Sequence, residues 1–435
     1  MSKDSQIIIK KNITKEIKLE LFTPYTDVIN KINAYTLTNM FYTIKYKITQ
    51  KLNYKLILSN EPNDYLEELG YDINYKKELS RHDLKEIKMH EYNEINALLR
   101  PFERYRKIND LLYNDNESFN PYKNIIEIYK LLHYNSEIPV FENFNTIIDN
   151  NLLTLHKNIS FLNCTFSPQP TNKTIKYILK KIYSNIKTIN YYDLNISSDN
   201  IMSNYITKLY NITEIDYAIT KFKTKMNLIV MALVSFKLFN IDAYLYEKYY
   251  TQQFFYSIIF VLQLLKKNGT CIILSFSYFT EISIELLYIL KKFFKKLVFT
   301  KYTTGKHSTS STKIIASRFK GIPTEELNEL LKIAKEISIY NKKYDNYDKN
   351  YKFIKSILDI DKTDKEYKLF RAEVIKFNTL NKKYTENNIN LFSKIIQFYK
   401  TNNDNKLLDD ILIRKQIHIL FLWLNKYNIL KICNN

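Results

Sequence analysis

Residues 250–319 read YTQQFFYSIIFVLQLLKKNGTCIILSFSYFTEISIELLYILKKFFKKLVFTKYTTGKHSTSSTKIIASRF, and this stretch decides the fold class. Its first part predicts an amphipathic helix, because apolar residues recur at helical spacing from Phe254 to Leu265. Lys266-Lys267 suit the last turn of that helix and Asn268-Gly269 suit its C-cap. Thr270–Phe276 follows as a continuous apolar run of strand length, which is typical of a buried central strand.

The second part of the stretch repeats the alternation of helix and strand. It predicts a helix over Ile282–Phe294, a strand over Leu297–Lys301, a polar loop over Thr303–Ser311 and a strand over Lys313–Ser317. Helices that alternate with buried strands in this way form half of a doubly wound α/β sheet. The fold class expected is therefore α/β, with a Rossmann-like sheet that has helices on both faces.

The order of these segments and their residue patterns resemble those of a known family. Leu264–Gly269, Thr270–Phe276 and Thr304–Ser311 stand where FtsJ-type RNA ribose 2′-O-methyltransferases have a helix ending in L-x-x-G-G, a strand T-x-x-I-K-x-F and a loop S-R-P-x-N-S-E. The chain resembles the divergent members found in large DNA viruses, over about Leu228–Phe319. The resemblance implies a methyltransferase-like sheet of seven strands and descent from enzymes that use S-adenosylmethionine.

The resemblance does not extend to the residues that perform the family's chemistry, a Lys-Asp-Lys-Glu set around the ribose hydroxyl. The strand lysine falls on Leu274, the final glutamate on Ser311, and the aspartate on Ala232, or on Ser235 without a gap. Lys107 is the one candidate for the remaining lysine. Three of the four roles are therefore vacant, and the resemblance implies a degenerate active site.

The loop that would receive the cofactor also departs from the family. It follows a strand that begins near Ile159 and reads Ser167-Pro168-Gln169-Pro170, without glycine. Glycines let the backbone approach a cofactor without an intervening Cβ, and proline removes a backbone donor. We therefore expect no bound cofactor. No CxxC or Cys/His cluster is present either, so no metal is expected. The next strand, Ile186–Ile189, is followed by Asp193, a possible ribose-binding acid.

Composition favours a polyanionic partner. The 435 residues carry a formal net charge of +20, which attracts nucleic acid, although AT-rich coding also inflates lysine content. Three scattered cysteines indicate neither a disulfide framework nor a zinc site. No apolar run suits a signal peptide or a membrane span, so a cytoplasmic location, or the virion for a viral protein, is expected. Two basic clusters are the nucleic-acid-binding candidates: Arg100, Arg104, Arg106 and Lys107, and then Lys291, Lys292, Lys295, Lys296, Lys301 and Lys306.

The sequence predicts three regions: an α-rich N-terminal region (1–139), the methyltransferase-like domain (140–320) and a helical C-terminal extension (321–435). In the first region, Asp27–Tyr46 reads as a helix and Lys55–Leu58 as a strand. The sheet also includes a strand over Lys225–Ser235. The extension begins with a helix after Pro323 and continues with helices that we place at Tyr351–Leu358, Asp364–Asn381, Glu386–Thr401 and Lys406–Tyr427.

Three functions remain open. The first is a catalytically inactive homologue of an RNA cap or ribose 2′-O-methyltransferase, which binds RNA or forms a hetero-oligomer with an active RNA-processing enzyme. The second is an active S-adenosylmethionine-dependent enzyme with a rearranged site that uses Lys107, or Lys306 and His307. The third is a structural virion protein that contacts no RNA. The absence of three of the four catalytic residues favours the first.

Overall fold

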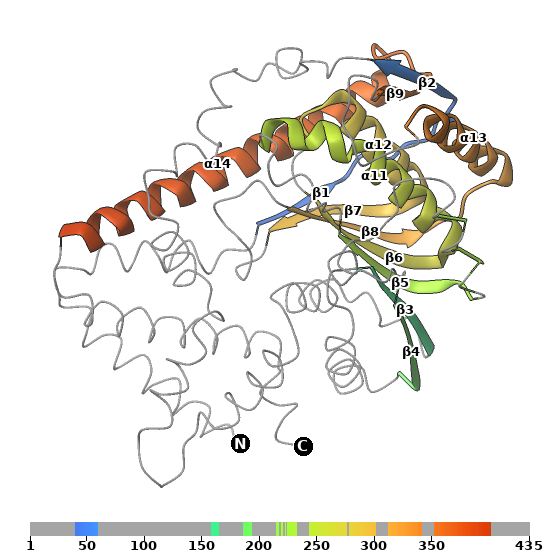
Figure 1. Ribbon diagram of the computed structural model, residues 1–435, viewed down its shortest axis with the longest axis horizontal. Coiled ribbons are helices and arrows are strands. Elements are labelled where there is room, and N and C mark those ends of the chain that lie inside the picture. The colour runs from blue at the N-terminus through green and yellow to red at the C-terminus, as the bar shows by residue number, and fades with distance from the viewer. Residues whose placement is uncertain are drawn as a thin grey trace, which may run out of the picture.

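The described part of the chain is organised around one mixed sheet with long helices packed on it (Figure 1). The computed structural model describes residues 40–59, 158–164, 186–193, 215–216, 219–220, 222, 224–232, 243–275, 278–301, 312–341 and 352–401. The sheet has seven strands: β1 (Met40–Ile44), β3 (Asn158–Cys164), β4 (Thr188–Asp193), β5 (Met226–Ala232), β6 (Leu265–Ser275), β7 (Phe294–Lys301) and β8 (Thr312–Phe319). The α/β class predicted from the sequence is confirmed.

The strands lie in the order β1-β7-β8-β6-β5-β3-β4. The four strands β4, β3, β5 and β6 are parallel to one another. Strand β8 is antiparallel to both β6 and β7, so β7 runs in the same direction as β6. Strand β1 closes that side of the sheet as an antiparallel edge strand.

The centre of the sheet is buried on both faces. Successive residues of a strand point to opposite faces, and Ile272 and Ile273 of β6 are both 0% exposed. Strand β6 lies between β5 and β8, which confirms the prediction that Thr270–Phe276 contains a buried central strand. Strands buried on both faces are continuous apolar runs rather than alternating ones, as this segment is.

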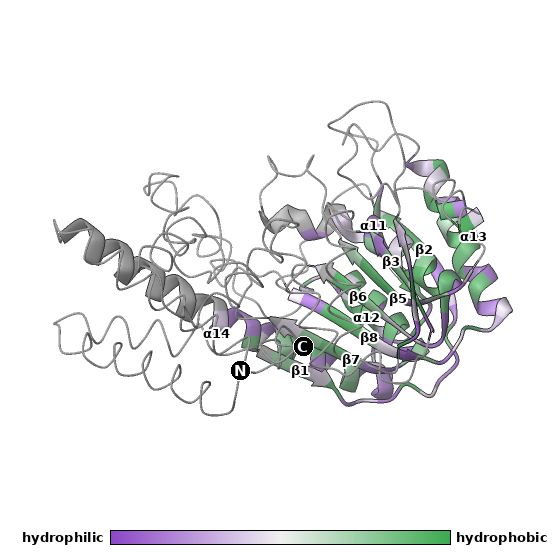
Figure 2. Cartoon of the chain, turned by 90° about the horizontal axis from the view of Figure 1, so that it is seen from below, coloured by the Kyte–Doolittle hydropathy of each residue, from purple (hydrophilic) through white to green (hydrophobic). Residues whose placement is uncertain are grey.

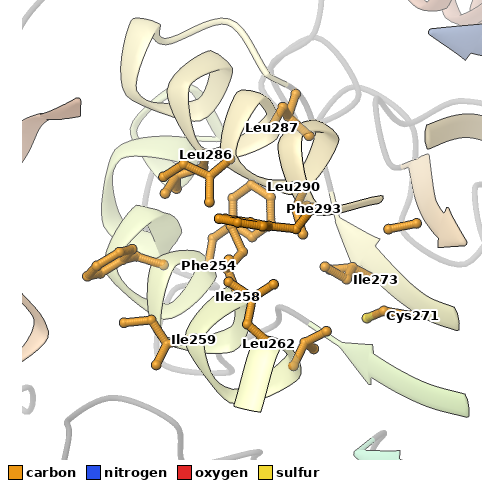
Figure 3. Close-up of a cluster of buried hydrophobic side chains, with 14 of the residues drawn as sticks. Phe254, Ile258, Ile259, Leu262, Cys271, Ile273, Leu286, Leu287, Leu290 and Phe293 are labelled. Carbon is orange, nitrogen blue, oxygen red and sulfur yellow. The ribbon is translucent and has the colours of Figure 1, made fainter. Parts of the chain in front are cut away.

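Four described helices lie together on one side of the sheet (Figure 1): α11 (Ala243–Leu264), α12 (Glu281–Phe293), α13 (Thr324–Tyr340) and α14 (Lys365–Thr401). The side chains of α11 and α12 pack together over β6, with Phe254, Ile258, Leu286 and Leu290 all fully buried (Figure 3). Local sequence sets the limits of α12. Thr280 is its N-cap and accepts a hydrogen bond from Ser283 N, and Glu281 supplies a first-turn acid.

The junction between α11 and β6 differs from the prediction. Helix α11 ends at Leu264, so Lys266-Lys267 belong to β6 and not to the last helical turn. A register irregularity in the pairing of β5 with β6 accommodates the extra residues. Asn268 adopts a φ of 64°, and a Cβ on Gly269 would lie 2.8 Å from Leu265 Cγ. The Asn-Gly pair therefore serves a strand bulge directly after the helix rather than a helix cap.

The predicted N- and C-terminal regions meet in a second sheet. Strand β2 (Tyr54–Ser59) pairs antiparallel with β9 (Phe353–Leu358). The strand expected at Lys55–Leu58 is confirmed, whereas the helix expected at Tyr351–Leu358 is wrong. The helix expected over Asp27–Tyr46 is also wrong where it can be compared, because β1 occupies part of it. Both errors concern short apolar runs whose conformation is decided by the strands with which they pair.

Helix α14 is a single element of 37 residues. The sequence predicts two helices there, over Asp364–Asn381 and Glu386–Thr401, which the structure joins. Figure 1 shows α14 running from the α/β body well past the edge of the sheet. In Figure 2 the apolar residues gather on the sheet and on the helix surfaces that face it. The segment predicted at Lys406–Tyr427 lies outside the described residues.

Candidate functional site

The carboxyl ends of the parallel strands define the expected position of a site in this sheet. After β3 the chain adds β4 on one side and then crosses to add β5 on the other. Ligands of open α/β sheets bind in the crevice outside the strand ends at such a switch point. The strands that end there finish at Cys164 (β3), Asp193 (β4), Ala232 (β5) and Ser275 (β6).

Two of the vacant family positions lie next to each other at this edge. Ala232 and Leu274 are register partners on adjacent strands, which lie about 4.8 Å apart in a sheet. Neither residue type can ionise, donate or accept a proton through its side chain. The third vacant position, Ser311, directly precedes β8 and lies outside the described residues. So do Lys107 and the loop Ser167–Pro170.

A lysine that the sequence analysis did not single out lies at the same edge. Lys313 of β8 stands opposite Leu274 in the register of β6 with β8, and it is only 6% exposed. On the other side of β8, strand β7 places Thr300 opposite Lys313. Only the pairing of β6 with β8 reveals this position, since Leu274 and Lys313 are far apart in the sequence. A lysine is therefore present one strand away from the position where the family has one.

Aromatic side chains fill the region just beyond the end of β6. Tyr278 is fully buried, with its ring centroid 5.4 Å from that of Phe299 and 6.2 Å from that of Phe377. Phe299 and Phe377 stack at 4.3 Å. Asn378 Nδ2 donates a hydrogen bond of 2.6 Å to the carbonyl oxygen of Tyr278. Side chains of α14 therefore pack against this end of the strand edge.

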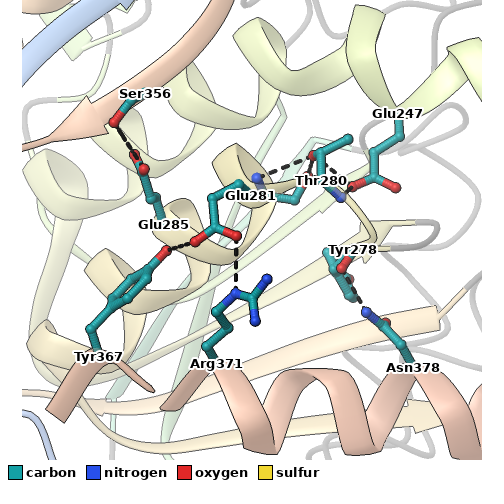
Figure 4. A network of polar contacts seen from close by, with 10 residues as sticks. Glu247, Tyr278, Thr280, Glu281, Glu285, Ser356, Tyr367, Arg371 and Asn378 are labelled. Carbon is teal, nitrogen blue, oxygen red and sulfur yellow. Dashed lines mark hydrogen bonds and ion pairs between the residues drawn. The ribbon is translucent and has the colours of Figure 1, made fainter. Parts of the chain in front are cut away.

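The turn between β6 and α12 is held by a carboxylate from α11. Glu247 accepts hydrogen bonds from Phe279 N at 3.0 Å and from Thr280 N at 2.8 Å (Figure 4). Burial raises the pKa of Glu247, and the hydrogen bonds from the 279–280 backbone oppose that increase. The side chain satisfies backbone donors at a helix start that water does not reach. Through these hydrogen bonds, Glu247 stabilises the turn at the start of α12.

Two further glutamates of α12 hold the C-terminal segments. Glu285 accepts hydrogen bonds from Ile357 N at 2.8 Å and from Leu358 N at 3.1 Å, at the end of β9. Glu281 accepts one from Tyr367 Oη at 2.7 Å and pairs with Arg371 Nε at 3.0 Å on α14 (Figure 4). These buried carboxylates are all engaged with protein groups, so none of them is a candidate for the missing catalytic acid.

The second predicted basic cluster is divided by the structure. Lys291 and Lys292 end α12, and Lys295 and Lys296 begin β7, all at the amino-terminal edge of the parallel strands. Lys301 ends β7, five residues beyond Lys296, which is roughly 17 Å along a strand. It therefore lies at the opposite edge. Lys306 and the first cluster, Arg100, Arg104, Arg106 and Lys107, lie outside the described residues.

No family model and no curated protein matches this chain. Among the described residues, no group of three or more His, Cys, Asp and Glu side chains is arranged to hold a metal ion. The described helices also include none that is both long and apolar enough to cross a membrane.

Proposed function

We propose that this chain is a catalytically inactive homologue of an FtsJ-type RNA ribose 2′-O-methyltransferase. In this proposal it acts as an RNA-binding or enzyme-partner subunit in viral mRNA processing. The observation that carries the proposal is the pair Ala232 and Leu274, which are neighbours at the carboxyl ends of β5 and β6. The family's reaction needs a carboxylate and a lysine at these positions, since one lysine, tuned by a carboxylate, orients or deprotonates the hydroxyl.

The strand order supports descent from this family. Four parallel strands with a switch point beside β3 are followed by an antiparallel strand, β8, between β6 and β7. A methyltransferase-like sheet has this arrangement. A fold alone specifies no activity, and a fold that has lost its catalytic groups still serves as a scaffold. The net charge of +20 supports RNA, or a protein bound to RNA, as the partner.

Titration with S-adenosylmethionine tests the inactive state most directly. We expect no heat of binding at micromolar cofactor, because the loop Ser167–Pro170 lacks glycine. Incubation with labelled cofactor and capped or uncapped RNA should likewise transfer no methyl group. A dissociation constant in the low micromolar range together with RNA methylation would refute the proposal.

One observation favours a second candidate, an active enzyme with a rearranged site. Lys313 places an amine opposite Leu274 at the strand edge. If wild-type protein methylates RNA, Lys313→Met should abolish that activity, whereas Lys335→Met on the exposed surface of α13 should not. Activity that survives Lys313→Met would move the search to Lys107, Lys306 and His307.

A further inference from the structure

Lysines from three separate segments converge at the amino-terminal edge of the sheet. Strand β1 runs antiparallel to β7, so the residues after Ile44 emerge beside the start of β7, and the residue after β8 emerges there too. We call the resulting set the amino-edge cluster: Lys47, Lys291, Lys292, Lys295 and Lys320. Its members come from the 45–51 segment, from the junction of α12 with β7, and from the end of β8.

Hydrogen bonds hold the backbone of the cluster in place. Lys291 Nζ donates to the carbonyl oxygen of Lys295 at 3.1 Å, and Lys292 Nζ donates to that of Gln50. Lys320 N donates to the carbonyl oxygen of Phe293 at 2.8 Å. Lys291 is buried beneath the cluster, whereas Lys47, Lys295 and Lys320 are exposed. The exposed ammonium groups are thus carried by a connected, preorganised backbone.

The positive charges of the cluster are incompletely neutralised. Burial first, and then the charges of Lys320 and Lys47, lower the pKa of Lys291 to about 8 against the opposing effect of Glu373. The pKa of Lys320 is also lowered, first by partial burial and then by the charges of Lys292 and Lys295. The charges therefore repel one another, and a bound anion would relieve that repulsion.

A purely structural role explains only part of the cluster. Lys291 and Lys292 complement the helix dipole at the end of α12. Lys47, Lys295 and Lys320 belong to no helix, and their exposed side chains contribute little to folding. These three lysines are left for a role in binding.

We propose that the amino-edge cluster binds consecutive backbone phosphates of single-stranded RNA. Lysine is a compact point charge that suits phosphate oxygens, and three exposed lysines on three segments match a chain of phosphates better than one isolated anion. The site lies at the opposite edge of the sheet from Ala232 and Leu274. This inference rests on the RNA-binding part of the proposed function and specifies where the RNA lies.

The triple variant Lys47→Ser, Lys295→Ser, Lys320→Ser tests the site in the full chain. Each phosphate contact contributes about 0.7 to the slope of log affinity against log salt for single strands, so the triple variant should flatten the slope by about 2. Fluorescence anisotropy with a labelled uridine oligonucleotide between roughly 50 and 300 mM salt, a range over which screening increases steadily, measures that slope. The matched control is Lys332→Ser, Lys335→Ser, Lys355→Ser, which removes equal charge from exposed positions on α13 and β9.

The control triple should keep the wild-type slope, and both variants should keep the wild-type melting temperature. An equal decrease of the salt slope in both triple variants would overturn the inference, because it would show that RNA binding depends only on net charge. An unchanged slope in the cluster variant, with RNA binding intact, would also overturn it while leaving the proposed function in place. Wild-type protein without any RNA affinity at low salt would instead refute the RNA-binding part of the proposed function.

Proton uptake gives an independent test. A phosphate beside the cluster should raise the pKa of Lys291 from about 8, so RNA binding at pH 8 should take up part of a proton. Calorimetry in two buffers of different ionisation enthalpy measures this uptake. Lys291→Met keeps the aliphatic stem and should abolish it, whereas Lys335→Met should not. Equal uptake in wild type and Lys291→Met would contradict the assignment.

Discussion

Glu285 joins α12 to the end of β9 through a carboxylate that is removed from water. It is 0% exposed, and it accepts hydrogen bonds from Ser356 Oγ, Ile357 N and Leu358 N. Burial raises its pKa to about 7, although the hydrogen bonds oppose that increase. The folded protein therefore retains a proton on Glu285 at pH values where the unfolded chain, with a pKa of 4.5, has released it.

The first prediction follows from the sign of this difference. Between pH 4.5 and about 7 the folded state binds more protons, so the contribution of Glu285 to stability falls as pH rises. The total change is on the order of 3 kcal/mol. Glu285→Gln does not titrate, so the free energy of unfolding of wild type minus that of the variant should fall across this window. Urea denaturation at pH 5, 6, 7 and 8 measures it, and parallel curves would contradict the prediction.

Gly269 is required for the close approach of β6 to β5. A Cβ there would lie 2.8 Å from Leu265 Cγ and Lys266 O, and 3.1 Å from Asn227 O. Gly321 has a φ of 95° but no atom within 4 Å of the corresponding position. Substituting Gly269 therefore measures the cost of steric overlap, whereas substituting Gly321 measures the cost of backbone strain.

We predict that Gly269→Ala destabilises the protein by about 1–3 kcal/mol through overpacking. Gly321→Ala should cost about 1 kcal/mol through its positive φ alone. Thermal and urea denaturation of the two variants give the comparison. Equal losses would show that the neighbours of Gly269 move aside without significant cost.

Helix α12 packs against β7, β8, β9, α11 and α14, and its position was predicted well from the sequence. Its expected range, Ile282–Phe294, differs from Glu281–Phe293 by one residue at each end. The capping threonine, the first-turn glutamate and the apolar periodicity are all local signals, so they are visible in the sequence. The same is true of β8, where a short apolar run precedes Pro323 and a new helix.

Strand β9 shows where local signals fail. Its sequence FIKSIL fits either a strand or a helix, because short apolar runs are ambiguous. The strand forms because β2, some 300 positions earlier, pairs with it. In addition, Glu285 accepts hydrogen bonds from two of its backbone N–H groups. The position of Lys313 opposite Leu274 was hidden for the same reason. Neither pairing has a signal in the local sequence.

Phe377 packs helix α14 against the sheet. This ring is 0% exposed, stacks on Phe299 at 4.3 Å and lies 6.0 Å from Tyr42. Phe377→Ala should cost about 3–5 kcal/mol, the usual range for removing a buried Phe. Leu380→Ala, on the same helix but 42% exposed, should change stability by less than about 0.5 kcal/mol. Urea denaturation separates these outcomes, and similar losses would mean that α14 is not anchored by this ring.

At the scale of the whole molecule, the predicted boundaries at residues 139 and 320 cross one hydrophobic core. Ile44, Ile48 and Leu52 precede the first boundary, and Phe370, Val374 and Phe377 follow the second. All six belong to the same buried cluster as α11 and α12. Composition and loop signals do not reveal such a core, because its members meet only after the chain has folded.

The last prediction is that residues 140–320 do not form a stable unit alone. Each buried large apolar side chain contributes about 1.5–3 kcal/mol, so the six residues from the flanking regions supply on the order of 10 kcal/mol. Typical domains are stable by only about 5–15 kcal/mol, so this loss is comparable to the whole stability. Fragment 140–320 would also expose the edge of β7, which β1 covers in the full chain. Calorimetry should show a cooperative transition for residues 40–401 and none for 140–320, and a cooperative transition in the shorter fragment would establish it as an autonomous domain.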